Sequence, residues 1–156
     1  MKKELIVFIP SLQIGGVEKN FFILTNNLSK RLNISVITST SKIKNNLNRN
    51  IKLICPNISF IEKLSMRLRF LICLYYLFKK IFLNPKAIVI SFQGNMYSVF
   101  LCKLLRVKII LRLNSSPIGW SKNLFKKFIY IIGLKLADGV IVNSKKFKYQ
   151  IRKEFN

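Results

Sequence analysis

The chain alternates between short apolar runs and longer segments with helical periodicity. Five consecutive apolar residues, Leu5 to Ile9, are rich in β-branched types and predict a strand covered on both faces. A turn containing Gly15 and Gly16 follows. Apolar residues then repeat at the 3.6-residue period of a helix, at Val17, Phe21, Leu24 and Leu28. The first 28 residues therefore predict a strand, a glycine loop and a helix.

The same alternation continues to the end of the chain. Further strands are predicted at residues 33–38, 51–54, 87–91, 107–113 and 140–142. Helices are predicted at residues 58–83, 96–105 and 124–136, and from an Asn143-Ser144 cap to Asn156. Strands that alternate with helices predict an α/β fold with a doubly wound parallel sheet. At 156 residues the chain is long enough for one such domain.

The predicted helix at residues 58–83 contains the most apolar run of the chain, Phe70 to Phe78. Nine apolar residues fall short of the roughly 18 that cross a bilayer. Basic residues precede and follow the run, and two tyrosines lie near its end; these are Arg67, Arg69, Tyr75, Tyr76, Lys79 and Lys80. The pattern fits a helix lying in a membrane interface, and equally a core helix with solvated charges at its ends.

The loops that follow the strands are the places to look for a binding site, because ligands of such sheets lie beyond the carboxyl ends of the strands. These loops are Ser11–Lys19, Gln93–Asn95, Arg112–Pro117 and Asn143-Ser144. They are rich in Gly, Ser, Asn and Gln, whose donors suit sugar hydroxyls and phosphates. The glycines also leave the first helical N–H groups uncovered for an anion. Neither a GxGxxG nor a GxxxxGK[ST] motif occurs, which argues against dinucleotide-binding and P-loop enzymes.

The net charge of +23, from 28 Lys and Arg against 5 acids, predicts attraction to polyanions or to an anionic membrane. The basic residues are spread along the whole chain, so a compositional bias explains them equally well. Three cysteines, far apart and without any histidine, predict buried thiols in a reducing compartment, with neither a disulfide nor a metal site. Pro10 interrupts the first apolar run, which predicts the first strand of a cytoplasmic domain rather than a signal peptide.

Three segments, in this order, carry a resemblance to a known family. They are Ile9-Pro10-Ser11-Leu12 with Gly15-Gly16-Val17-Glu18-Lys19, then Leu111-Arg112-Leu113-Asn114-Ser115-Ser116-Pro117, then Ala137-Asp138-Gly139-Val140-Ile141-Val142-Asn143-Ser144. Together they resemble the N-terminal half of retaining, nucleotide-sugar-dependent glycosyltransferases of the GT-B fold, family four. The resemblance covers essentially the whole chain and implies a Rossmann-like domain that forms one half of a GT-B fold.

The resemblance also implies roles for individual residues. Gly15 and Gly16 would approach the pyrophosphate of a nucleotide-sugar donor. The acceptor side would be lined by Gln93, Asn114 and Ser115, with Arg112 and Ser144 nearby at strand ends. Many members of the family carry a histidine about where Asn114 stands, and catalytic residues stay unassigned. No cofactor or metal ion is implied beyond the donor substrate.

In the family a C-terminal domain holds the donor and supplies paired glutamates. Residues 1–156 would be the acceptor-side domain, inactive without that domain, which a separate polypeptide would provide unless the reading frame is truncated. The expected acceptor is a glycan or a lipid-linked sugar of cell-envelope polysaccharide synthesis, and the expected location is cytoplasmic, peripheral on the inner face of the membrane.

The alternative function is a basic module that binds nucleic acid or an anionic membrane without catalysis. Nucleic acid is disfavoured, because the sequence shows no recognition helix, aromatic platform or arginine-rich arm. A remnant domain without a function is a third reading.

Overall fold

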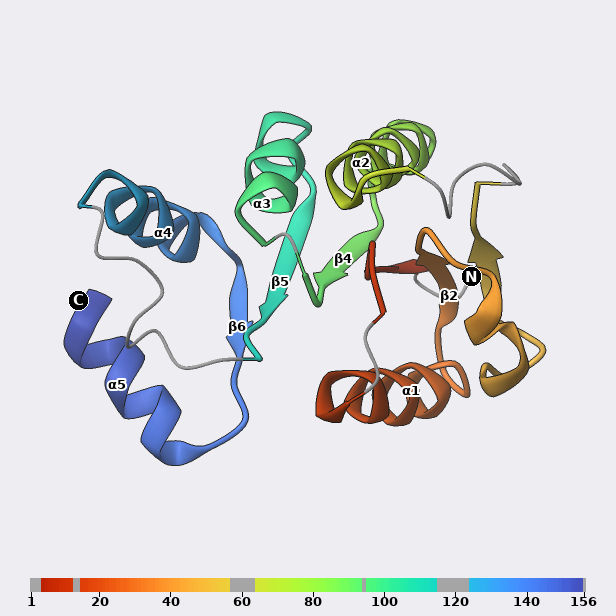
Figure 1. Ribbon diagram of the computed structural model, residues 1–156, viewed down its shortest axis with the longest axis horizontal. Helices are drawn as coiled ribbons and strands as arrows, with labels where there is room; N and C mark the ends of the chain where they lie inside the picture. Colours follow the sequence, from red (N-terminus) through yellow and green to blue (C-terminus); the bar gives the residue numbers. More distant parts are fainter. Residues whose placement is uncertain (1–3, 13–14, 57–63, 94, 115–123, 156) are drawn as a thin grey trace.

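The computed structural model describes residues 4–12, 15–56, 64–93, 95–114 and 124–155, and it confirms all six predicted strands (Figure 1). The strands are β1 Glu4–Phe8, β2 Asn33–Ile37, β3 Lys52–Ile54, β4 Ile88–Ser91, β5 Lys108–Arg112 and β6 Gly139–Ile141. The helices are α1 Gly16–Leu28, α2 Met66–Leu83, α3 Asn95–Leu104, α4 Leu124–Leu136 and α5 Lys145–Phe155, and a 3₁₀ helix, η1, spans Lys42–Asn46.

The six strands form one parallel sheet in the order β3-β2-β1-β4-β5-β6. This is the strand order of a doubly wound Rossmann-type sheet, in which the chain reverses direction of travel between two neighbouring central strands. Here those strands are β1 and β4, which pair directly. The predicted fold class is therefore confirmed, and the crevice expected for a ligand lies beyond the ends of β1 and β4.

Helices cover both faces of the sheet, with α1 on one face and α2, α3 and α4 on the other (Figure 1). The residues of β1 alternate between the two cores, as strand geometry requires. Leu5 and Val7 pack with Phe21 of α1, whereas Ile6 and Phe8 pack with Leu77 of α2. The five side chains from Leu5 to Ile9 are each at most 4% exposed, which explains the uninterrupted apolar run in the sequence.

Helix α2 begins later than the periodicity predicted. It starts at Met66, because Ser65 forms the cap and its hydroxyl accepts a hydrogen bond from Leu68 N at 3.4 Å. Residues 58–63 of the predicted helix lie outside the described residues. The helix buries Cys73, Leu77 and Ile81, so it is a core helix, and it ends before Asn84 and Pro85. In the described part of the chain, no helix has the length and apolarity to cross a membrane.

The buried face of helix α4 differs from the one that the spacing of its apolar residues suggests. Phe128 and Leu136, predicted on the apolar face, are 59% and 39% exposed. The core is instead contacted by residues such as Tyr130 and Leu134. The reason lies at Gly133, where a Cβ atom would sit 2.3 Å from Sδ of Met96, so α3 and α4 approach closely at this glycine. Gly133 therefore lies on the buried face of α4, where its missing side chain leaves room for Met96.

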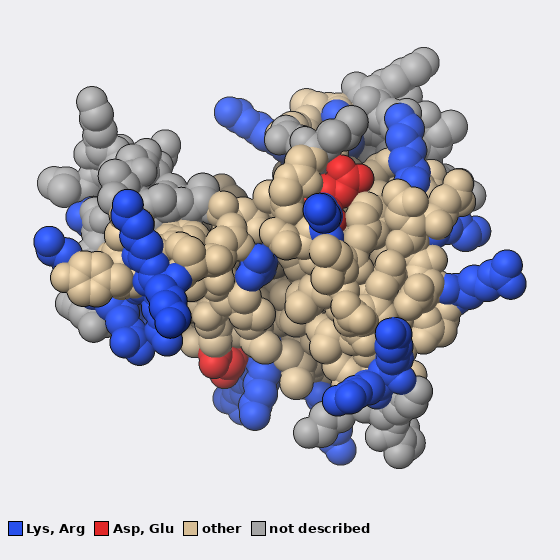
Figure 2. Space-filling model, turned by 90° about the horizontal axis from the view of Figure 1, so that it is seen from below, with Lys and Arg blue, Asp and Glu red and all other residues tan. Residues whose placement is uncertain are grey.

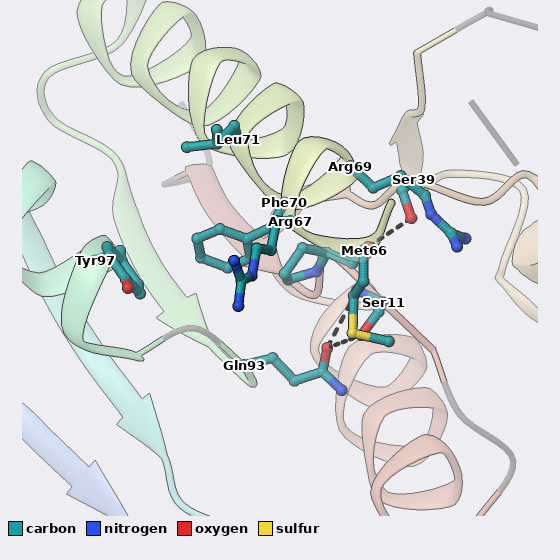
Figure 3. A pocket seen from close by; sticks show the side chains of 10 residues that line it. Ser11, Ser39, Met66, Arg67, Arg69, Phe70, Leu71, Gln93 and Tyr97 are labelled. Atoms are coloured by element: carbon teal, nitrogen blue, oxygen red, sulfur yellow. Dashed lines mark hydrogen bonds between the residues drawn. The ribbon is translucent and has the colours of Figure 1, made fainter. Parts of the chain in front are cut away.

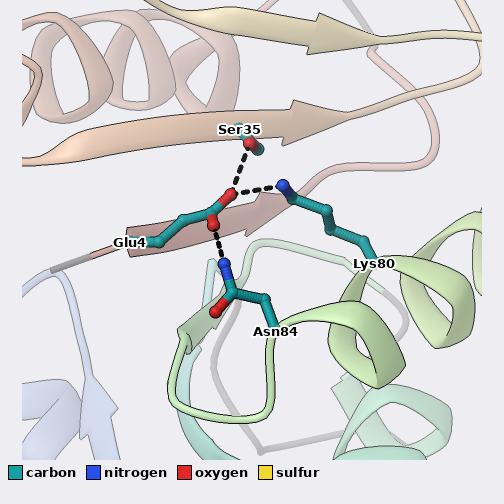
Figure 4. A network of polar contacts seen from close by, with 4 residues as sticks. All are labelled: Glu4, Ser35, Lys80 and Asn84. Carbon is teal, nitrogen blue, oxygen red and sulfur yellow. Dashed lines mark hydrogen bonds and ion pairs between the residues drawn. The ribbon is translucent and has the colours of Figure 1, made fainter.

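Polar contacts close the amino-terminal edge of the sheet (Figure 4). Glu4, at the start of β1, accepts hydrogen bonds from the Ser35 hydroxyl at 2.9 Å and from the Asn84 amide, and it pairs with Lys80 Nζ at 2.6 Å. Burial raises the pKa of Glu4, but the hydrogen bonds from these three groups and the charge of Lys80 outweigh it, so the pKa lies below its usual value of 4.5. The cluster ties the carboxyl end of α2 to β1 and β2.

A second acid stabilises the same edge further along the sheet. Asp138 accepts hydrogen bonds from Lys103 Nζ at 2.6 Å and from Ile109 N at 2.8 Å. Burial raises the pKa of Asp138, but Lys103 and the Ile109 amide together lower it below its usual value. Glu4 and Asp138 therefore both hold elements together at the amino-terminal edge of the sheet, away from the crevice.

The cysteines match the prediction of buried thiols in two cases. Cys73 and Cys102 are fully buried and form no disulfide, and burial raises the pKa of each thiol to about 12. Cys55 is only partly buried, so the prediction is wrong at that position.

Candidate functional site

The loops after β1 and β4 meet at the crevice of the sheet. Gln93, two residues beyond β4, accepts hydrogen bonds at its amide oxygen from Ser11 N at 3.1 Å and from the Ser11 hydroxyl at 2.7 Å (Figure 3). One side-chain oxygen thus holds both the backbone and the side chain of the neighbouring loop. In Figure 3 the amide nitrogen of Gln93 points away from Ser11.

The same edge is tied together across β4, β5 and β6. Asn114 Nδ2 donates to the Phe92 carbonyl at 2.8 Å, and Arg112 Nη2 donates to Asn143 Oδ1 at 2.5 Å. Asn143 Nδ2 in turn donates to the Asn114 carbonyl at 3.4 Å. Gln93, Arg112 and Asn114 therefore lie along one edge, as the sequence predicted, although Ser115 lies outside the described residues.

Two buried amide oxygens near the end of β5, Asn95 Oδ1 and Asn114 Oδ1, have no hydrogen-bond partner within the described part of the chain. Leaving such an oxygen unpaired costs about 1–3 kcal/mol of folding free energy. Arg112 is also partly desolvated, because burial lowers the pKa of its guanidinium. Because both oxygens are buried, they are not surface groups that a ligand can reach in this conformation.

Ser144 caps the amino-terminal end of α5. Its hydroxyl accepts a hydrogen bond from Phe147 N at 3.1 Å, at the start of α5. This confirms the predicted cap, since serine oxygens at this position satisfy a free N–H of the first turn. Ser144 lies at the carboxyl edge with Asn143, and the predicted contact with an acceptor stays a prediction.

The amino-terminal end of α1 has no side-chain cap among the described residues. Gly15 and Gly16 are exposed, no side chain caps the helix, and the first helical hydrogen bond runs from Lys19 N to the Gly15 carbonyl at 3.2 Å. A Cβ atom on either glycine would meet nothing within 4 Å, so packing within the described residues does not require glycine at these positions. Open N–H groups at a helix start attract anions, and Glu18 in the first turn complements the same helix dipole.

A pocket of about 720 Å³ opens between the loop after β1 and the start of α2 (Figure 3). Its lining combines two arginines, three polar side chains and five apolar or aromatic ones: Arg67, Arg69, Ser11, Ser39, Gln93, Pro10, Met66, Phe70, Leu71 and Tyr97. In Figure 3 Arg67 lies on the side of Gln93, whereas Arg69 extends the other way beyond Ser39. The pocket therefore offers a cation, hydroxyl partners and an aromatic wall to a single ligand.

Ser39 and Tyr97 were not predicted as site residues. Ser39 follows β2 at the carboxyl edge, where its hydroxyl donates to the Pro10 carbonyl at 2.6 Å, so its position after a predicted strand was an available signal. Tyr97 lies on α3. The helical periodicity of the sequence does not tell whether an aromatic residue on this helix packs in the core or lines a pocket. Among the described residues, no group of three or more His, Cys, Asp or Glu side chains is placed to hold a metal ion.

No protein-family model matches the sequence, and no curated protein matches it. Solved structures do match. Anabaena Alr3699/HepE in complex with UDP and glucose superimposes with a TM-score of 0.66 at 11% identity, over 97% of this chain and 41% of that one. Glycyrrhiza uralensis UGT73P12, complexed with glycyrrhetinic acid 3-O-monoglucuronide, gives a TM-score of 0.64 at 8% identity, over 99% and 47%.

Phytolacca americana UGT2, complexed with UDP-2fluoro-glucose and pterostilbene, gives a TM-score of 0.55 at 13% identity, over 90% of this chain and 47% of that one. The matched structures are GT-B glycosyltransferases. The chain has the fold of a GT-B half-domain. It spans less than half the length of the structures that it matches, and at these identities the likeness concerns the fold.

Proposed function

We propose that the chain is the acceptor-side half of a nucleotide-sugar-dependent glycosyltransferase. The observation that carries the proposal is the bridge between Ser11 and Gln93, because it joins the loops of β1 and β4 at the crevice of a GT-B half-domain. The bridge borders the 720 Å³ pocket, and the bare start of α1 follows the same β1 loop. Polar groups that converge beside an apolar pocket are the usual form of a small-molecule site.

The acceptor sugar occupies the pocket. Gln93 presents its amide nitrogen to an acceptor hydroxyl, and Tyr97 and Phe70 provide the aromatic wall on which a sugar ring lies. Arg67 faces an anionic group of the acceptor, such as a phosphate. Asn114, Arg112, Ser115 and Ser144 extend the acceptor side toward β6. This assignment is supported by the position of Arg112 and Asn114 on one edge of the sheet.

The donor is a nucleotide sugar, and structural neighbours were crystallised with UDP and with UDP-glucose. Gly15 and Gly16 approach the donor diphosphate with their open N–H groups. This contact explains the glycine at position 16, where packing within the described residues does not require one, whereas the φ of +159° at Gly15 already disfavours a side chain. The remaining donor contacts come from a second, C-terminal domain that carries paired glutamates. That domain either continues this polypeptide or is supplied by another one, and transfer requires both halves.

The acceptor is a glycan or a lipid-linked sugar of cell-envelope polysaccharide synthesis, modified at the cytoplasmic face of a membrane. The mixture of arginines and aromatic side chains at the start of α2 supports an acceptor that is part anionic and part apolar.

A binding measurement tests the acceptor assignment. A short-chain alkyl diphosphate sugar is titrated into the chain by isothermal calorimetry, with the alkyl diphosphate and the free sugar as separate probes. We expect saturable binding of the complete probe and binding about tenfold or more weaker after Gln93→Met with Tyr97→Ala. The matched control is Tyr149→Ala on α5, which is 68% exposed and far from the pocket lining. Equal binding by all variants would contradict the assignment.

The alternative, a basic module without catalysis, rests on the net charge of +23. Figure 2 shows basic side chains scattered over the face in view, at its edges and near its middle, whereas a nucleic-acid groove would gather them along a track. Binding of single-stranded DNA that exceeds binding of the alkyl diphosphate sugar, with a steep salt dependence, would favour the alternative.

A further inference from the structure

Helix α2 has a second apolar face that the domain core does not use. Its buried face is formed by Cys73, Leu77 and Ile81, each 0% exposed. Five further large apolar residues, spaced three or four apart, are between 41% and 69% exposed: Leu68, Leu71, Tyr75, Phe78 and Phe82. At this spacing they form one continuous stripe along the helix. One apolar face is enough to pack α2 on the sheet, so packing within the described residues does not explain the stripe.

The stripe continues onto α3. Tyr97, Phe100 and Leu104 are 66%, 42% and 80% exposed, and α3 lies beside α2 (Figure 1). The rings of Phe70 and Tyr97, 5.3 Å apart, connect the two helices. Together the exposed residues of the stripe and of α3 form what we call the α2–α3 apolar face. Of the sixteen exposed large apolar residues in the described chain, thirteen lie on α2, α3 and α4, so the exposure is concentrated on one side of the sheet.

The charges around this face are of one sign. Neither α2 nor α3 contains an acidic residue. Arg67 and Lys79 are exposed and stand next in sequence to Leu68 and Phe78 of the stripe, so they flank it on the helix surface. Lys80 and Lys103 belong to the same helices but pair with Glu4 and Asp138. An apolar face bordered by cations complements a surface that is apolar inside and anionic outside.

We propose that the α2–α3 apolar face docks on an anionic lipid bilayer. Phe, Tyr and Leu side chains enter the boundary between headgroups and acyl chains, while Arg67 and Lys79 contact anionic headgroups. A second copy of the chain is the less favourable occupant, because each copy carries a net charge of +23 and would bring the same cations to the interface. Nucleic acid is a poor match for an aliphatic and aromatic stripe that offers few polar groups.

The face runs directly into the pocket. Leu71 and Tyr97 belong to both, and Met66, 57% exposed, lines the pocket at the first turn of α2 (Figure 3). A docked chain therefore holds the pocket mouth at the bilayer surface. This step rests on the proposed function: a lipid-anchored acceptor reaches Gln93 from the bilayer without leaving it.

Vesicle flotation tests the docking surface without any sugar. The chain is mixed with vesicles of phosphatidylcholine and phosphatidylglycerol, and with vesicles of phosphatidylcholine alone. We expect flotation on the anionic vesicles and affinity about tenfold or more lower after Phe78→Gln with Phe82→Gln, since two exposed rings no longer enter the bilayer. The control pair, Ile23→Gln with Tyr149→Gln, replaces residues of α1 and α5 that are 52% and 68% exposed, and it should float like the unmodified chain.

A second pair of variants tests whether the cations beside the apolar face contribute to vesicle binding. Lys79→Gln should weaken flotation more than Lys30→Gln, although both lower the net charge equally, because Lys30 lies at the end of α1 on the other face. Circular dichroism confirms that each variant is folded.

Four results would overturn the proposal: flotation unchanged in the α2 variant, equal losses in both apolar pairs, equal binding to uncharged vesicles, or a dimer in the ultracentrifuge that the α2 variant dissociates. Calorimetry with the water-soluble alkyl diphosphate sugar reports on the pocket independently, so either proposal can fail without the other.

Discussion

Replacing Gln93 tests whether the bridge to Ser11 organises the crevice. The most informative pair is Gln93→Met, which keeps the size of the side chain and removes the acceptor, and Gln93→Glu, which keeps an acceptor oxygen. In Gln93→Met the Ser11 N–H and hydroxyl lose their partner, at 3.1 and 2.7 Å in the native chain. In Gln93→Glu a carboxylate oxygen still accepts both bonds, but the amide nitrogen that would donate to an acceptor hydroxyl is gone.

The expected size follows from the two hydrogen bonds. Each contributes about 0.5–1.5 kcal/mol, so Gln93→Met should lower the free energy of unfolding by about 1–3 kcal/mol. For a domain of this length, 1 kcal/mol corresponds to a melting-temperature change of about 2–4 °C. Gln93→Glu should retain nearly the native stability, because hydrogen bonds to a charged acceptor are at least as strong as those to an amide.

Urea unfolding followed by circular dichroism measures the stability of each variant, and calorimetry with the alkyl diphosphate sugar measures acceptor binding. We expect Gln93→Met to lose both stability and binding, and Gln93→Glu to lose binding alone. A native urea midpoint in Gln93→Met would show that the bridge does not hold the β1 and β4 loops. Equal destabilisation by both variants would show that size or charge, and not the acceptor oxygen, matters at this position.

Three further predictions concern the rest of the chain. Glu4→Gln should destabilise the chain at neutral pH. In urea unfolding experiments the difference should begin to shrink near pH 4.5 and vanish only below the native pKa of Glu4, which lies under 4.5, because its contribution is lost when the native carboxylate is protonated. Gly16→Ala should leave the free energy of unfolding, measured with urea, unchanged or raise it by up to about 1 kcal/mol, since the added Cβ meets nothing, yet it should weaken donor binding once a second domain completes the site. Cys55 should react with iodoacetamide at pH 8 before Cys73 and Cys102, whose pKa values burial raises to about 12; mass spectrometry of the labelled peptides gives the order.

The sheet was predictable because its chemistry is local. Each strand is a short run of apolar or β-branched residues, such as Ile88 to Ser91, that ends at polar loop residues. The strand order 3-2-1-4-5-6 was not predicted, because alternation only narrows the possibilities to a few doubly wound arrangements. The edge that joins Gln93, Arg112 and Asn114 was nevertheless predictable, since parallel strands bring their carboxyl ends together.

Features that depend on packing between elements were not predictable from the pattern. The pocket combines side chains of α2 and α3 with loops that follow β1, β2 and β4, and no periodicity relates Ser39 to Tyr97. Helix η1 was missed because its sequence is Lys- and Asn-rich; the buried Ile43 and a bond from Asn26 Nδ2 to the Asn46 carbonyl at 2.9 Å hold it. The exposed stripe of α2 was also hidden, because an apolar sequence does not say which of its two faces meets the core.

The most direct test of the central claim is to map the acceptor onto the chain. Amide resonances of the ¹⁵N-labelled chain are followed by NMR while the short-chain alkyl diphosphate sugar is added. The account predicts that the largest shifts occur at Ser11, Gln93 and Tyr97, around the crevice between β1 and β4. Shifts concentrated at the opposite edge, around Glu4 and Asp138, would contradict it.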